Sequence, residues 1–193
     1  RSELRYALLY SSLLYLMPAA IRVTFIQPYV LAIGLPIASL GVIALVFRIF
    51  QVTGSTYAGK ISQRLGEWKL LLFFPIPIFI GLLAIGGIES WIGIALFAPS
   101  GFFSAAATPT IENVINRQTP SSIRATILSV DSLIFRLLSA MLSPCIGLVA
   151  DSLGLAAALT WMALLNIILM LILLLFWGRQ RNRARSFSAG SME

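Results

Sequence analysis

The positively charged residues of this chain lie mainly at its two ends and in alternate gaps between its apolar segments. Cutting the sequence at its apolar runs gives six stretches long enough to cross a membrane as helices: 6–27, 37–58, 70–88, 91–113, 125–149 and 155–177. Most Lys and Arg residues lie at the chain ends or in the second and fourth gaps: Arg1, Arg5, Lys60, Arg64, Lys69, Arg117, Arg124, Arg179, Arg181, Arg183 and Arg185. The other three gaps contain neither Lys nor Arg. Because basic residues of short loops stay in the cytoplasm, this pattern predicts six spans with both chain ends cytoplasmic.

The composition also indicates a membrane protein. Hydrophobic residues make up 59% of the chain and charged residues 11%, with a mean hydropathy of +0.93. Soluble domains carry about 25% charged residues, and helices of ~20 residues match a ~30 Å hydrocarbon core. We therefore predict an all-α six-helix bundle over residues 1–177, embedded in the plasma membrane, and a basic cytoplasmic tail over 178–193. The tail is expected to contact the lipid bilayer and to set topology, with no nucleic acid as partner.

Several kinds of chemistry are excluded by residue type. The chain has one cysteine, Cys145, and no histidine, so it can form no internal disulfide and no ordinary Cys/His metal site. With Asp131 counted as the only acid inside the spans, no acid–base pair is available for catalysis. We therefore expect the protein to bind no cofactor and no metal and to have no enzymatic activity. The start at Arg1 also suggests a fragment of a longer protein.

The six predicted spans differ in polarity. The third and sixth are almost entirely apolar, whereas the first, second and fifth carry charge and the fourth carries prolines and hydroxyl groups. Polar groups inside a membrane face protein or water, since lipid offers them no partner. We therefore predict that spans one, two, four and five enclose a polar cavity. Spans three and six should lie outside it, with Phe79 and Leu169 on the lipid-facing surface.

Four charged residues inside the spans are the candidate substrate or coupling site: Arg22, Arg48, Asp131 and Arg136. At ~1.5 Å per residue, Arg48 and Arg136 lie about 17 Å from their points of entry, near the midplane. An intramembrane arginine costs at least ~2.5 kcal/mol, so each should have a partner or a function. Asp131 is either a structural partner of one arginine or a site for a proton or cation. These four groups leave an excess of positive charge, which favours an anionic or zwitterionic solute.

An internal repeat is indicated by two pairs of glycines. Gly59 and Gly66 end the second span, and Gly147 and Gly154 end the fifth with the same spacing. The first pair would lie on the cytoplasmic side and the second on the external side. This arrangement is typical of three helices followed by three in inverted orientation.

Residues 59–69 resemble the G-x-x-x-D-R-x-G-R-[RK] loop signature of the major facilitator superfamily. Three positions match: Gly59, Arg64 and Gly66. Gln63 stands where the family has an acid, Glu67 where it has arginine, and Lys69 supplies the final base one place late. Residues 119–126 also resemble the region between the fourth and fifth helices of C-terminal halves. The resemblance implies half of a twelve-helix fold built from 3+3 inverted repeats, with a missing N-terminal six-helix half as its partner.

The resulting functional expectation is a secondary active transporter that moves a small organic solute by alternating access. An anionic or zwitterionic substrate is favoured by the arginines. Two alternatives remain open at this point. One is proton-coupled efflux of drugs or cations, with Asp131 as the cation or proton site. The other is a membrane scaffold that transports nothing, in which the helices associate through small residues.

Overall fold

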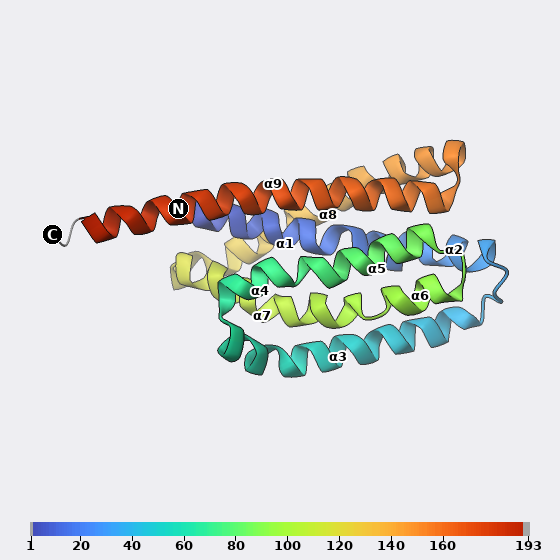
Figure 1. Ribbon diagram of the computed structural model, residues 1–193, viewed down its shortest axis with the longest axis horizontal. Coiled ribbons are helices and arrows are strands. Elements are labelled where there is room, and N and C mark those ends of the chain that lie inside the picture. Colours follow the sequence, from blue (N-terminus) through green and yellow to red (C-terminus); the bar gives the residue numbers. More distant parts are fainter. Residues whose placement is uncertain (1, 191–193) are drawn as a thin grey trace.

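The computed structural model describes the backbone of residues 2–190 and the side chains of residues 3–180, and all regular structure in that part is helical (Figure 1). The elements are α1 (Ser2–Ala20), the π-helical η1 (Ile21–Phe25), α2 (Ile26–Ala32), α3 (Ser39–Leu65), α4 (Glu67–Phe73), α5 (Pro75–Gly87), α6 (Trp91–Phe97), α7 (Ser100–Gln118), η2 (Ser121–Ile123), α8 (Arg124–Leu153) and α9 (Leu155–Gly190). In this part of the chain, six helices are long and apolar enough to cross a membrane. The predicted all-α bundle of six spans is confirmed.

Short breaks divide some spans without ending them. Pro75 follows the turn between α4 and α5, and Pro99 lies between α6 and α7. Pro18, Pro109 and Pro144 lie inside α1, α7 and α8. The sixth helix runs past the predicted end of its span to Gly190, so the tail is helical that far. The side chains of Arg181, Arg183 and Arg185 lie outside the described side chains, and 191–193 lie outside the described residues.

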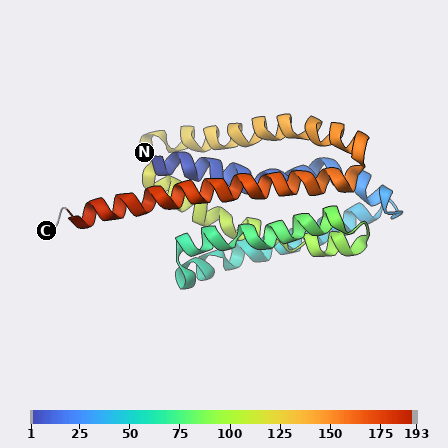
Figure 2. The same cartoon turned by 45° about the horizontal axis from the view of Figure 1, so that its top comes forward.

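The helices form two layers. In one layer α8, α1, α7 and α3 pack side by side in that order, which brings spans five, one, four and two into a row (Figures 1 and 2). The helices α5 and α9 pack against each other and cover one side of this row. Spans one, two, four and five therefore share a layer. The other side of the row is not covered by any described helix.

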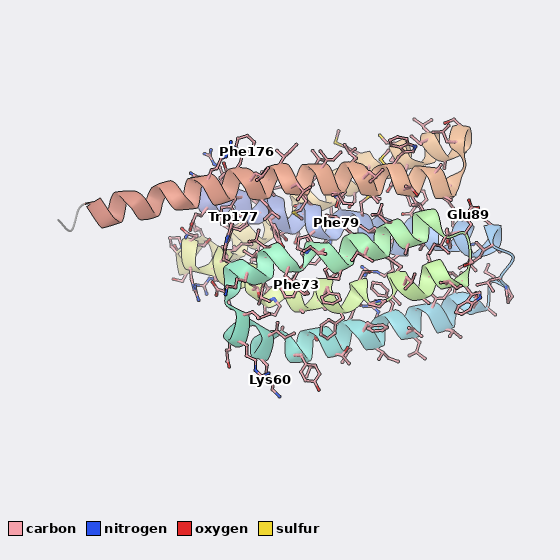
Figure 3. All side chains as sticks on the ribbon, in the orientation of Figure 1. Lys60, Phe73, Phe79, Glu89, Phe176 and Trp177 are labelled. Atoms are coloured by element: carbon pink, nitrogen blue, oxygen red, sulfur yellow. The ribbon has the colours of Figure 1, made fainter. Side chains whose placement is uncertain are left out.

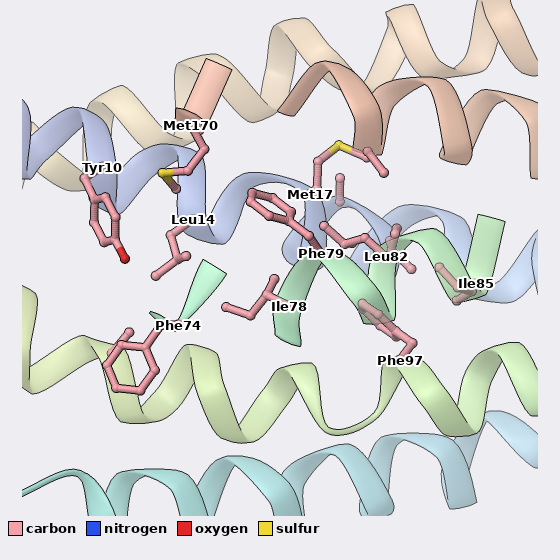
Figure 4. Packing of buried hydrophobic residues seen from close by; sticks show 14 of the residues in the cluster. Tyr10, Leu14, Met17, Phe74, Ile78, Phe79, Leu82, Ile85, Phe97 and Met170 are labelled. Carbon is pink, nitrogen blue, oxygen red and sulfur yellow. The ribbon is translucent and has the colours of Figure 1, made fainter. Parts of the chain in front are cut away.

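The core between the layers corrects one expectation about the third span. Phe79, which we expected to face lipid, is buried with Met17, Leu14 and Leu82 (Figure 4). More than half of the third span is buried inside the bundle, because α5 contacts α7 and α9 at once. Its lipid-exposed strip is narrow and includes Ile76 and Ile80. Polarity alone did not reveal this, since a fully apolar helix suits both environments. Leu169 on α9 is exposed as expected.

Two tyrosines connect the layers at opposite ends of the bundle. The Tyr10 hydroxyl donates to the Leu71 carbonyl oxygen over 2.7 Å. The Tyr29 hydroxyl donates to the Ile88 carbonyl oxygen over 2.6 Å. Both phenol rings are buried, so these bonds give buried hydroxyl groups the partners that an apolar core lacks.

The ends of α3 and α8 have matching backbone geometry. Each helix ends at a glycine with positive φ, Gly66 at φ 79° and Gly154 at φ 85°, and the next helix begins at the following residue. In both cases the glycine N–H donates to the carbonyl oxygen four residues earlier. A left-handed backbone of this kind favours glycine over any residue with a side chain. The two connections lie at opposite ends of the bundle, as inverted repeats require.

The start of α1 and the end of α9 lie at the same end of the bundle, and Glu89 lies at the other (Figure 3). We expect the Glu89 end to be extracellular, because its connections carry no basic residue. In a Cys145→Ser background, a cysteine at Ser90 should react with an impermeant thiol reagent on intact cells. A cysteine at Ser62 should react only after permeabilisation. Labelling of both positions on intact cells would contradict the predicted topology.

Candidate functional site

A cavity of about 640 Å³ lies on the uncovered face of the row. Its walls come from α1, η1, α7 and α8, which are parts of spans one, four and five. The second span, which we also expected to enclose the polar cavity, does not line it, because its helix α3 lies at the edge of the row. Three of the four predicted site residues line it: Arg22, Asp131 and Arg136. The structure therefore brings together charged groups that are more than 100 residues apart in the sequence.

Arg22 reaches this cavity from the π-helical turn of the first span. A π turn inserts an extra residue into a helix, shifts the side chains that follow and is frequent at functional sites. The Arg22 guanidinium lies over the ring of Phe47 on α3, with Cζ 4.9 Å from the ring centroid. This cation–π contact orients the group but leaves its N–H donors free. Within the described residues, Arg22 has no carboxylate or hydrogen-bond partner.

Asp131 is held by α1 rather than by an arginine. Ser11 Oγ donates to Asp131 Oδ2 over 3.2 Å, while Asp131 Oδ1 is buried and has no hydrogen-bond partner among the described residues. The possibility that Asp131 structurally neutralises an arginine is therefore not supported, because no described arginine lies within 4.0 Å of it. A carboxylate with one unsatisfied buried oxygen favours a proton or a ligand group at that position.

A second carboxylate, Glu112 on α7, was not among the residues predicted from the sequence. It lines the same cavity as Asp131 and Tyr15. The signal was present, because Glu112 lies within the predicted fourth span, one residue before its end. Counting it lowers the positive excess of the intramembrane charges from two to one. It also gives the cavity two acids and two arginines, instead of a single acid.

Hydroxyl groups line the wall between the acids. The Tyr15 hydroxyl and Thr108 Oγ1 are hydrogen bonded over 2.9 Å, joining α1 to α7. Tyr15 Oη also donates to the Ser104 carbonyl oxygen over 3.3 Å. This network fixes the distance between the two helices and keeps polar atoms at the cavity wall.

Arg48 lies apart from this cavity. Its Nη1 donates to Gln51 Oε1 on the same helix over 3.1 Å, and its side chain is exposed on α3. It nevertheless corresponds to Arg136 in the repeat, since Arg48 stands 18 residues before Gly66 and Arg136 stands 18 residues before Gly154. The two arginines lie on the outermost helices of the row. Arg136 is likewise exposed and has no partner among the described residues.

The comparison with protein families decides what this bundle is. The family model of the Major Facilitator Superfamily matches residues 7–192. The chain belongs to the Major Facilitator Superfamily. No curated protein and no solved structure matches it. Members of the superfamily are transporters rather than enzymes, so this chain is a multi-pass membrane protein of a transporter family.

In the loop that resembles the Major Facilitator Superfamily signature, Glu67 forms an ion pair with Arg117 on another span. Glu67, at the position of the family's arginine, accepts a hydrogen bond of 2.9 Å from Arg117 Nη1 at the end of α7, and Arg117 Nη2 lies 2.9 Å from its other oxygen. The pair connects the start of the third span to the end of the fourth. Gly66 has the positive φ described above, which favours glycine at that position. Gly59 has no such backbone constraint, and a Cβ added there would meet no atom within 4 Å. Arg64 is exposed and has no partner within the described part of the chain.

We expect Glu67→Arg to reduce transport severalfold, because it places two guanidinium groups together at this connection. The double variant Glu67→Arg/Arg117→Glu should recover most of the activity, since it restores opposite charges with the positions exchanged. The pair is partly exposed, with side chains 68% accessible for Arg117 and 25% for Glu67, so thermal stability should change by less than about 1 kcal/mol. Uptake and melting temperature measure the two effects. A double variant no more active than Glu67→Arg would show that the pairing is not what matters.

Proposed function

We propose that this chain is one six-helix half of a twelve-helix secondary active transporter in the plasma membrane, and that it moves a small organic solute with an anionic group by alternating access. The uncovered face of the row would contact the missing N-terminal half. The main support is the pair Arg22 and Arg136, which line one cavity without any carboxylate partner among the described residues. Arginine holds a carboxylate or phosphate with two parallel hydrogen bonds.

The arrangement of charges also supports coupling to protons. Asp131 lies five residues before Arg136 on α8, about 7.5 Å along the helix. Glu112 faces the same cavity from α7. We propose that a proton is carried by these carboxylates while the arginines hold the solute. Repulsion between two nearby carboxylates favours protonating one of them, which provides a reason for the acids to lie together.

Arg136→Lys tests the anion site. It keeps the charge but loses the planar pair of donors, and a hydrogen bond to a charged group is worth about 1.5–3 kcal/mol. We therefore expect kcat/KM for uptake of an organic anion to fall about tenfold or more in proteoliposomes. Arg124→Lys is the matched control, because Arg124 begins the same helix and does not line the cavity. Arg48→Lys tests separately whether Arg48, which corresponds to Arg136 in the repeat, also contributes to transport although it does not line the cavity.

Equal activity of the Arg136→Lys and Arg124→Lys proteins would contradict the anion site. The second candidate function, proton-coupled efflux of drugs or cations, would then be favoured by Asp131 and Glu112. Competition experiments separate the two functions directly. Organic anions should compete with the transported solute under the first, and lipophilic cations under the second.

A further inference from the structure

A second cavity also has Arg22 in its lining. It has a volume of about 510 Å³ and lies between η1, α2, α3 and α6, parts of spans one, two and four. Its walls are mainly aliphatic and aromatic, including Ile26, Leu40, Val46, Phe47, Trp91 and Phe97. We call this cavity the apolar groove. Its volume is within the range of small-molecule sites, which are typically apolar with a few placed polar groups.

We call the cavity of about 640 Å³ described above the central cavity, and Arg22 lines both it and the apolar groove. Its guanidinium lies against Phe47, which is itself part of the groove wall. The one strong positive charge of the groove, among the residues that the structure describes, is therefore at its junction with the central cavity. An acidic group bound by Arg22 would have the polar cavity on one side and the apolar groove on the other.

A second polar atom of the groove lacks a partner. Ser39 Oγ is buried and has no hydrogen-bond partner among the described residues, although Ser39 lines the groove. Ser39 begins α3, and Phe47 lies eight residues later, about 12 Å along a straight helix. The groove therefore runs along the bundle axis, with Arg22 at one level and the Ser39 hydroxyl at another.

We propose that the apolar groove binds the apolar arm of an amphiphilic organic anion whose acidic group is held by Arg22. This inference rests on the proposed function and narrows its substrate class to anions with a hydrophobic tail. An apolar helix of another protein would cover the groove walls but leave the Arg22 charge without an anion. A short hydrophilic anion would satisfy Arg22 and leave the groove without a ligand. An amphiphilic anion matches both features.

The position of Trp91 allows a direct binding test. A bromine atom quenches tryptophan fluorescence on contact, so 12-bromododecanoate is the probe, added to the complete transporter in nanodiscs of zwitterionic lipid. We expect saturable quenching that is lost in Trp91→Phe and retained in Trp161→Phe. Trp161 on α9 is the matched control, because it is 61% exposed and Trp91 is 65% exposed, but only Trp91 lines the groove. Unbrominated dodecanoate should compete with the probe.

Two pairs of substitutions separate the acidic group from the tail. Arg22→Gln should weaken binding about tenfold or more, and Arg124→Gln should leave it unchanged. Val46→Phe should narrow the groove and weaken binding, whereas Val52→Phe, on the same helix outside the groove, should not. From octanoate to dodecanoate, each added methylene should tighten competition about fourfold in the wild-type protein. This dependence should be weaker in Val46→Phe.

Several results would overturn the proposal. Quenching of Trp91 that is unsaturable and unaffected by Arg22→Gln would mean that the groove holds bilayer lipid. Equally tight binding of 12-bromododecan-1-ol would mean that no anion is recognised. Each variant must elute as a monodisperse peak, and the Val46→Phe and Val52→Phe pair keeps the test decisive if Arg22→Gln does not fold. Transport of short organic anions that depends on Arg136 but not on Val46 would retain the proposed function while refuting this inference.

Discussion

Replacing Asp131 with asparagine should abolish proton-driven accumulation of the solute. A pH difference of one unit across the membrane is worth about 1.36 kcal/mol per proton, so coupling of one proton to one solute can drive about tenfold accumulation. Asparagine keeps the size of the side chain and can still bond to Ser11, but it carries no titratable proton. We therefore expect Asp131→Asn to equilibrate solute without concentrating it, and its transport rate to vary little with pH.

The measurement is accumulation in proteoliposomes with an imposed pH gradient, compared with exchange when no gradient is present. Asp151→Asn is the matched control, since Asp151 lies at the exposed end of the same helix, α8. Glu112→Gln should be measured alongside, because Glu112 shares the cavity. Full accumulation by Asp131→Asn and loss of it by Glu112→Gln would transfer the proton site to α7.

The second large effect concerns folding. Gly54 is a point of very close approach between α3 and α7, and a Cβ at this position would overlap the backbone carbonyl of Phe102. We expect Gly54→Leu to separate the two helices, to expose Phe47 and to lose most of the folded protein. Backbone atoms cannot rotate out of the way as a side chain can, and overpacking of this kind costs about 1–3 kcal/mol or more.

Gly59→Leu provides the comparison, because it makes the same change five residues further along α3, where an added Cβ would meet no atom within 4 Å. Leucine is a better helix former than glycine by roughly 0.5–1 kcal/mol, so Gly59→Leu should retain or raise stability. The melting temperature and the monodisperse fraction in detergent report both effects. Equal losses in the two variants would show that α3 tolerates no bulk at all, and that the contact with Phe102 is not the cause.

The sequence was most informative about the number of membrane-spanning helices and least informative about depth of burial. Charge alternation and span length follow from how the chain meets water and lipid, and both can be seen in the residues. Spans one, four and five share a polar cavity as predicted, because charge inside a membrane must face protein or water, whereas span two, which carries the exposed Arg48, does not line it. The position of Phe79 could not be predicted, since lipid and protein core are equally apolar solvents for a phenyl ring.

The candidate site was predicted in part. Arg22, Asp131 and Arg136 were identified because charge inside a span is costly, and the structure places them on one cavity. Glu112 was not predicted, although it carries the same signal and lies within the predicted fourth span. The apolar groove had no sequence signal, since its walls come from three spans and its residues are ordinary for a membrane helix.

The hydroxyl groups of Tyr10 and Tyr29 have a consequence for how this bundle moves. They join the two layers near opposite ends of the bundle, and the apolar core lies between them. Sliding one layer over the other would break both hydrogen bonds, and the bond of Tyr10 lies in the apolar core, where no water replaces it. We therefore expect the six helices to move as one rigid body. The conformational change should then occur at the uncovered face of the row.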